Sequence, residues 1–236
     1  MASSNDGSVA AVLSARPPAA RGLTNSLGSI SPRQVVRWRL LTLASAEYLP
    51  LLSYTVGVLE SFGHNRSAFA VGCADVTCPS FCASIGVDAI RQGADAASTR
   101  QRVGTLKFSM LLATLRRGHH AFCFDLDVFF FSDPVHPIHV VQRLREGFEV
   151  VVQGQYGSNR TGGKVVEQDN FGLFAMPPSS LPAAQAMLAR YETSCKYEAS
   201  CKWDQGIFNH ETSKMRRAYL PPPLKVVGIQ SNRMHR

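Results

Sequence analysis

The sequence predicts an α/β fold in which helices flank a mostly parallel β-sheet. From about residue 35 to residue 191, short apolar runs that suit strands alternate with longer segments whose apolar residues recur at helical spacing. The run Phe122–Pro134 is apolar except for three aspartates and a serine, which is typical of a strand covered on both faces. Strands that alternate with helices form parallel sheets, and such sheets bind ligands outside the carboxyl ends of their strands.

The chain is expected to hold a disordered tail and one domain. Residues 1–34 are rich in Ser, Ala, Gly, Asn and Pro and have no periodicity, which predicts a tail without a core of its own. Residues 35–236 are enough for one sizeable core. The most apolar window, 40–59, contains Glu47 and Pro50, so it is interpreted as a strand and a helix rather than a membrane span.

In the first half of the domain, Val35-Val36 and Leu40–Leu43 are predicted to form a first strand. Leucines and a valine at helical spacing follow over residues 49–59, and Gly63 is a suitable helix end. Apolar patterning then predicts a strand at 68–71, a short helix at 81–85 and a short strand at 87–89. The clearest helix is 99–117, which is apolar over two neighbouring faces and ends at Gly118.

In the second half, the strand that begins at Phe122 is expected to stop at Asp133-Pro134. A helix is predicted over 138–144, strands over 149–152 and 173–176, and a helix over 181–191. The Gly-rich, polar segment 154–163 is expected to be a loop.

Two acidic residues, Asp125 and Asp127, interrupt the apolar run at 122–134. Residues i and i+2 of an extended chain point to the same side, so their carboxylates are expected to converge. Buried charges are costly unless they are compensated, and a hard cation such as Mg²⁺ or Mn²⁺ prefers oxygen ligands. The alternative is that both side chains only cap turns.

Charge and cysteine spacing exclude some other functions. The net charge is +8, but the basic residues are scattered and no aromatic-rich RNA motif accompanies them, so no nucleic-acid partner is expected. Cys73, Cys78 and Cys82 lack the spacing of a zinc finger and have no matching second half. Cys123 is interpreted as a small core residue. In an oxidising lumen, residues 195 and 201 could form a local disulfide.

Four landmarks in order resemble the nucleotide-diphospho-sugar transferase family of GT-A (Rossmann-like) fold, which includes plant cell-wall xylosyltransferases and arabinosyltransferases. The landmarks are Lys107-Phe108 on a helix that ends at Arg117-Gly118, the Asp125-Leu-Asp127 run with Asp133-Pro134, Asn170-Phe-Gly172, and Asp204-Gln205 with Phe208-Asn209. The resemblance implies a metal-dependent transferase that moves a sugar from a UDP-sugar to a glycan or glycoprotein acceptor, with retention of configuration. It does not distinguish xylose, arabinose and galactose.

The resemblance also implies roles for individual residues. Asp127 is expected to bind Mn²⁺ or Mg²⁺, and Asp125 the ribose or the metal through water. Lys107, Asn170 and Gly172 would lie at the donor and its sugar pocket. The expected catalytic residues are Asp204, which would contact the transferred sugar or the acceptor, and Gln205, which would help orient them. The family supplies a third metal ligand, a histidine, near the end; here only His235 is available, and its surroundings do not match. The resemblance implies a Golgi or other secretory location, although no signal or anchor is visible.

Two other functions fit parts of the sequence. A haloacid-dehalogenase-like phosphotransferase also places Asp-x-Asp after an apolar strand, with the first Asp as nucleophile. That family expects Thr or Val where Phe129 stands. A GT-A domain that binds a nucleotide without turnover is the other alternative, because the end of the chain matches the family weakly.

Overall fold

The computed structural model describes residues 37–91, 99–135, 137–157, 166–197 and 204–220, which all belong to the predicted domain. The predicted tail at 1–34, Val35-Val36 and His235 lie outside these residues.

Seven strands form one sheet with the order β3-β2-β1-β4-β6-β5-β7. Pairing is parallel from β3 through β4, β6 runs antiparallel to both of its neighbours, and β7 is parallel to β5. The mostly parallel sheet of the predicted α/β fold is therefore confirmed. The strands are β1 (Trp38–Ala44), β2 (Phe69–Cys73), β3 (Asp88–Arg91), β4 (His120–Phe124), β5 (Val150–Gly157), β6 (Val166–Met176) and β7 (Arg217–Tyr219).

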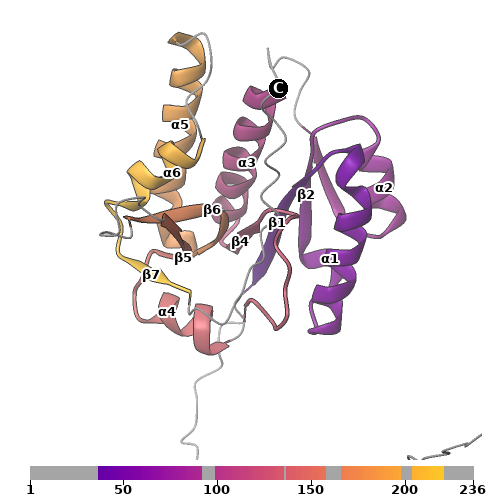
Figure 1. Cartoon of the computed structure of the whole chain (residues 1–236), viewed down its shortest axis with the longest axis horizontal. Coiled ribbons are helices and arrows are strands. Elements are labelled where there is room, and N and C mark those ends of the chain that lie inside the picture. The colour runs from indigo at the N-terminus through magenta and orange to yellow at the C-terminus, as the bar shows by residue number, and fades with distance from the viewer. Residues whose placement is uncertain (1–36, 92–98, 136, 158–165, 198–203, 221–236) are drawn as a thin grey trace, which may run out of the picture. The chain divides into compact units, whose positions relative to one another are not determined.

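Helices cover both faces of the sheet (Figure 1). One face carries α1 (Leu49–Ser61), α2 (Cys78–Ser84) and the turn η3 (Pro137–Val141), which runs into α4 (Gln142–Arg145). The opposite face carries α3 (Thr99–Arg116), α5 (Leu181–Tyr197) and α6 (Asp204–Thr212). Three short turns, η1 (Ala46–Tyr48), η2 (Arg66–Ala68) and η4 (Pro178–Ser180), complete the described elements. Among them, no helix is both long and apolar enough to cross a membrane.

Alternation along the central strands divides the core into two layers. In β4, Phe122 and Phe124 face the α1 side, whereas Ala121 and Cys123 face the α3 side. Burial of both sets explains why this strand is apolar from Ala121 to Phe124. Cys123 is a buried free thiol, as predicted.

Most predicted elements are found, but two predictions were wrong. The predicted helix 138–144 is found as the π-helix η3 followed directly by α4. The strand predicted from Phe122 to Asp133 ends at Phe124. The first part of the predicted loop, 154–157, belongs to β5, because its backbone pairs with β6 from Gly154↔Asp169 to Gly157↔Val166. Ladder pairing satisfies the backbone there, which outweighs the poor strand propensity of glycine. Helix α6 and strand β7 were not predicted.

One disulfide joins Cys73 to Cys78, a pairing that the cysteine spacing did not predict. Cys195 is also disulfide-bonded. Cys201, its suggested partner, lies outside the described residues.

A glycine sets the distance between α3 and α5. A Cβ atom at Gly104 would overlap the ring of Tyr191, which is fully buried and packs against Phe108 at 5.4 Å between ring centroids. We expect Gly104→Ala to lower the free energy of unfolding by about 1–3 kcal/mol, because the ring has no free space to move into. Urea denaturation measures the change.

A matched helix position serves as the control. A Cβ at the exposed Gly57 of α1 meets nothing within 4 Å, so Gly57→Ala should stabilise the protein by up to about 1 kcal/mol. Equal effects of the two substitutions would contradict the close packing of α3 on α5.

Candidate functional site

The order of the strands creates a switch point between β1 and β4. From β1 the chain moves outward to β2 and β3, and it then returns to β4 on the other side of β1. All four strands are parallel, so their carboxyl ends meet at one edge of the sheet. Asp125 directly follows the end of β4, and ligands of doubly wound sheets bind at this kind of position.

The two aspartates lie in a tight turn. Val128 N donates to Asp125 O at 3.0 Å, so residues 125–128 fold back immediately after β4. The prediction that these residues lie on an extended chain, with both carboxylates on one side, was therefore wrong, because the chain turns at this point. The carboxylates are nevertheless close enough that the charge of Asp125 contributes to raising the pKa of Asp127.

Lys107 of α3 forms the central ion pair of the site. Its Nζ lies 2.8 Å from Asp125 Oδ1 and 4.1 Å from the ring centroid of Phe171 in β6. Burial lowers the pKa of Lys107, but the charges of Asp125 and Asp204 outweigh this and raise the pKa above its usual value. The lysine is therefore a permanent cation that holds one carboxylate oxygen of Asp125.

Asp127 is in a different position. Burial raises the pKa of Asp127, and repulsion from Asp125 raises it further. Among the described residues, no side-chain cation forms an ion pair with Asp127. A carboxylate that is partly buried beside a like charge gains from a cation, and its oxygen atoms suit Mg²⁺ or Mn²⁺.

The absence of a side chain at Gly172 lets β6 approach Asp125. A Cβ there would lie 2.6 Å from Asp125 Oδ2 and 2.9 Å from Asn170 Oδ1. The backbones are also joined, since Asp125 N donates to Gly172 O at 2.8 Å. Asn170 Oδ1 accepts from Gly172 N at 2.8 Å, and Asn170 Nδ2 donates to Gln153 Oε1 at 3.0 Å. Asn170 and Gly172 thus border the Lys107–Asp125 pair.

Helix α6 brings Asp204 and Gln205 to the same strand. Gln205 Oε1 accepts from Phe171 N at 3.0 Å, and Gln205 Nε2 donates to Asp169 O. The buried amide therefore bridges two backbone groups on either side of Asn170, next to the shift in β5–β6 register. Asp204 begins the helix, and its charge acts on Lys107.

A second buried carboxylate, Asp169, supports this arrangement and was not predicted. Its Oδ2 accepts from Thr212 Oγ1 at 2.5 Å and lies 3.2 Å from Arg217 Nη1. These contacts tie α6 and β7 to β6. Phe171 was also missed as a contact of Lys107; its place between Asn170 and Gly172 was the available signal.

The structure thus brings together all seven predicted site residues, which come from three elements (α3, β6 and α6) and one turn. They are Lys107, Asp125, Asp127, Asn170, Gly172, Asp204 and Gln205. The third acid of the motif, Asp133, pairs instead with His64, with 2.8 Å between Asp133 Oδ1 and His64 Nε2. In the described ranges, no third His, Cys, Asp or Glu ligand groups with Asp125 and Asp127.

A family model of the nucleotide-diphospho-sugar transferases matches residues 68–229. The chain belongs to this family. The match covers every predicted site residue of the chain. It also disfavours the phosphotransferase alternative, which rested on the Asp-x-Asp pattern alone.

Solved structures with a similar fold include other glycosyltransferases. The bifunctional glycosyltransferase WbbM aligns over 83% of this chain and 40% of its own, with 11% identity and a TM-score of 0.53. GlyE of Streptococcus pneumoniae aligns over 80% and 46%, with 13% identity and a TM-score of 0.47. The galactosyltransferase LgtC aligns over 78% and 73%, with 12% identity and a TM-score of 0.48.

These likenesses bear on the fold only. The similarity to WbbM agrees with the predicted GT-A fold. The chain spans less than half the length of the WbbM and GlyE chains. No curated protein matches it by sequence.

The raised pKa of Asp127 predicts a pH dependence of stability. The folded chain binds this proton more tightly than the unfolded chain, so stability falls as the pH rises from the unfolded pKa through the folded pKa. Asp127→Asn removes this loss. Without metal, we expect the stability of the variant relative to wild type to be greater at pH 7 than near about pH 4.

Asp75 provides a control of opposite sign. Hydrogen bonding from the Thr77 side chain lowers the pKa of Asp75, helped by backbone donors and opposed by burial. Asp75→Asn should therefore lose stability relative to wild type as the pH rises above the folded pKa. Urea unfolding at about pH 4 and at pH 7 tests Asp127→Asn, whereas unfolding between about pH 2 and about pH 4 tests Asp75→Asn, because the lowered pKa of Asp75 places its stability change below the usual aspartate pKa. A pH-independent effect of Asp127→Asn would contradict the assignment.

Proposed function

We propose that the chain is a metal-dependent glycosyltransferase that takes a sugar from a UDP-sugar. The observation that carries the proposal is the meeting of Lys107, Asp125 and Asp127 with Asn170, Gly172 and Asp204 at the carboxyl edge of β4. Family membership supports the donor class. The acceptor, by the resemblance to plant cell-wall enzymes, would be a glycan or glycoprotein in the secretory pathway.

Two carboxylates with different partners suggest a division of roles. Asp125 is held by Lys107 through Oδ1, yet its side chain is 44% exposed. It can therefore still accept a hydrogen bond from a ribose hydroxyl or a metal-bound water. Asp127 has no side-chain cation of its own among the described residues, so we assign it the direct contact with Mn²⁺ or Mg²⁺. When bound, the divalent ion would neutralise charge on the departing diphosphate.

The remaining residues would position the sugar. Lys107 adds a fixed positive charge close to the site, which favours an anionic donor. Gly172 has no side chain, so the Asp125 carboxylate can lie against β6, and Asn170 is held by Gln153 and the backbone. The side-chain amide of Gln205 is already hydrogen-bonded to the backbone of β6. We therefore assign Gln205 the role of positioning Asp204 and Asn170, not a contact with the sugar. We propose transfer with retention and assign no nucleophile.

The test combines binding and turnover. The full chain is titrated with UDP in the presence and absence of Mn²⁺, and UDP release is then measured with UDP-xylose, UDP-arabinose and UDP-galactose. We expect Mn²⁺-dependent UDP binding and consumption of one donor. Asp127→Asn should weaken Mn²⁺-dependent binding at least tenfold, about 1.4 kcal/mol, while the protein stays folded.

The outcomes separate the alternatives. Asp88→Asn is the matched control, because Asp88 begins β3 at the opposite edge of the sheet and should leave binding unchanged. Mn²⁺-dependent binding without consumption of any donor supports a domain without turnover. An aspartyl-phosphate trapped on Asp125 supports the phosphotransferase, and the absence of UDP binding overturns the proposal.

Gly172 offers an independent test of the same site. Gly172→Ala would push Oδ2 of Asp125 away and break the pair with Lys107, so Mn²⁺-dependent UDP binding should fall at least tenfold, about 1.4 kcal/mol. Gly154→Ala in β5 is the control, since its Cβ would meet Tyr219 at an ordinary 3.4 Å. Equal binding by both variants would show that the close approach of β6 to Asp125 is unimportant.

A further inference from the structure

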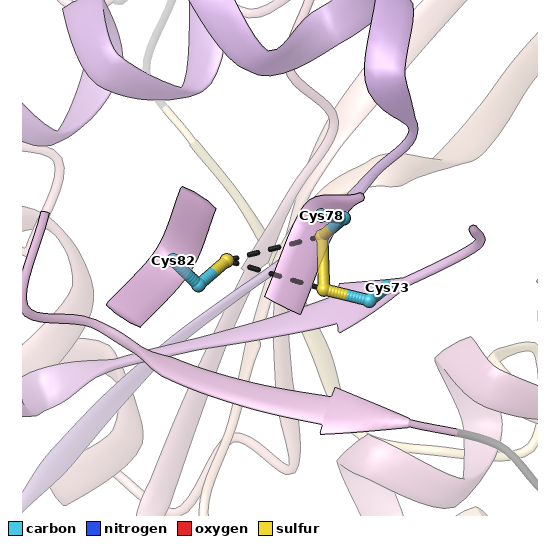
Figure 2. Close-up of side chains that lie close together, drawn as sticks. All are labelled: Cys73, Cys78 and Cys82. Carbon is cyan, nitrogen blue, oxygen red and sulfur yellow. Dashed lines mark hydrogen bonds between the residues drawn. A yellow bond between two sulfur atoms is a disulfide. The ribbon is translucent and has the colours of Figure 1, made fainter. Parts of the chain in front are cut away.

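Three cysteine sulfurs meet on the α1 side of the sheet, outside the proposed donor site (Figure 2). Cys73 Sγ and Cys78 Sγ form the disulfide, and Cys82 Sγ lies 3.9 Å from the first and 3.8 Å from the second. Cys78 and Cys82 are fully buried, and Cys73 is 7% exposed. Cys82 is thus a free thiol placed beside a disulfide that it does not share.

Local structure explains the convergence. Cys73 is the last residue of β2 and points to the same face as Phe69 and Val71. Cys78 and Cys82 are four residues apart on α2, so both face β2 from one side of the helix. Four residues separate Cys73 from Cys78, and three separate Cys78 from Cys82. This spacing does not suit a zinc finger, but it brings the three sulfurs together when a strand is followed by a short helix.

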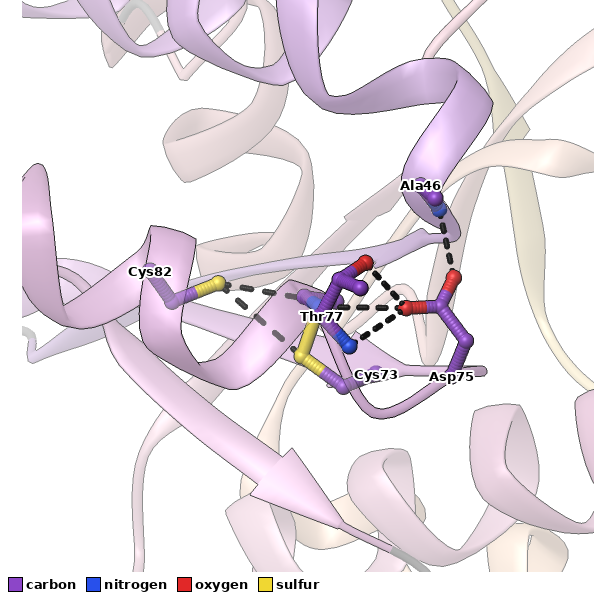
Figure 3. The surroundings of a disulfide bond; sticks show 6 residues. Ala46, Cys73, Asp75, Thr77 and Cys82 are labelled. Atoms are coloured by element: carbon purple, nitrogen blue, oxygen red, sulfur yellow. Dashed lines mark hydrogen bonds between the residues drawn. A yellow bond between two sulfur atoms is a disulfide. The ribbon is translucent and has the colours of Figure 1, made fainter.

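The loop between Cys73 and Cys78 is held by more than the disulfide (Figure 3). Asp75 Oδ1 accepts from Thr77 N at 2.9 Å, Thr77 Oγ1 at 2.7 Å and Cys78 N at 3.1 Å. Asp75 Oδ2 accepts from Ala46 N at 2.5 Å. These bonds would keep the three cysteines together after the disulfide is opened.

The sulfur positions suit a tetrahedral thiolate centre. Zn–S bonds of about 2.3 Å at tetrahedral angles place neighbouring sulfurs about 3.8 Å apart. Two sides of the sulfur triangle already have this length, at 3.8 and 3.9 Å. Only the bonded pair, Cys73 and Cys78, would have to separate.

We propose that Cys73, Cys78 and Cys82 form a three-thiolate site for Zn²⁺ when the Cys73–Cys78 disulfide is reduced. A dithiol reductant supplies two electrons and two protons, which turns the disulfide into two thiols while the dithiol becomes a disulfide. Zn²⁺ then replaces the three thiol protons, which are released. Water takes the fourth position, as in other zinc sites with three protein ligands.

The disulfide form and the zinc-bound form exclude each other, so the redox environment decides which of them is present. An oxidising lumen favours the disulfide, whereas a reducing compartment favours the thiolates. Exchange of the disulfide onto Cys82 is the competing chemistry. Cys82 Sγ lies beside the S–S bond, almost equally far from both sulfurs, and not along the axis from which a thiolate attacks.

The experiment uses the full chain, reduced with dithiothreitol, desalted under anaerobic conditions and titrated with Co²⁺ and then Zn²⁺. We expect thiolate-to-cobalt charge-transfer absorption that saturates at one Co²⁺ per chain and disappears when Zn²⁺ displaces the cobalt. The oxidised chain should show no such absorption. Cys82→Ala should weaken Co²⁺ binding at least tenfold.

Cys123→Ala is the matched control, because Cys123 is also a buried free thiol but lies on the other face of the sheet. It should bind Co²⁺ like wild type. A reduced wild type without charge-transfer absorption, or equal affinity in Cys82→Ala, overturns the proposal. If Cys82→Ala does not fold, alkylation of the wild type decides: Zn²⁺ should protect Cys73, Cys78 and Cys82 together, and equal alkylation with and without Zn²⁺ overturns the site.

Discussion

The ion pair between Lys107 and Asp125 is the interaction that holds the site together. It joins α3 to the turn after β4 across 2.8 Å, and the ammonium group also rests on Phe171 of β6. A buried lysine loses solvation, and the charges of Asp125 and Asp204 are what keep it protonated. The charge of Lys107 is therefore stable only while α3, the turn after β4 and β6 keep their positions. The missing side chain at Gly172 and the hydrogen bond from Asp125 N to Gly172 O hold the turn against β6.

Around this pair, the protein uses ordinary packing to fix polar groups. Phe171 stacks on Phe108 and Phe174 and contacts Phe208, so the strand that carries Asn170 and Gly172 is anchored in the α3-side core. Gln205 supplies backbone partners where the β5–β6 register shifts. The cost of an irregular strand at the site is thus offset by a side-chain amide and by an aromatic core.

Asp125 and Asp127 show how the surrounding residues can give two similar side chains different roles. Asp125 has a permanent cation, whereas Asp127 is partly buried beside a like charge and its pKa is raised. The cysteines show the same principle in sulfur chemistry. Cys123 is an isolated thiol in one layer of the core, whereas Cys82 lies against two further sulfurs in the other layer.

Local patterns in the chain were sufficient to predict the alternation of strands and helices and the family landmarks, because periodicity and residue type act over short stretches. They also singled out Asp125 and Asp127, since two acidic residues stand out in a run that is otherwise almost wholly apolar. Folding was needed to show that these acids occupy a turn, that polar residues 154–157 pair with β6, and that Asp75 holds the loop between Cys73 and Cys78. Those features depend on partners distant in sequence or on turn geometry, and neither composition nor spacing encodes them.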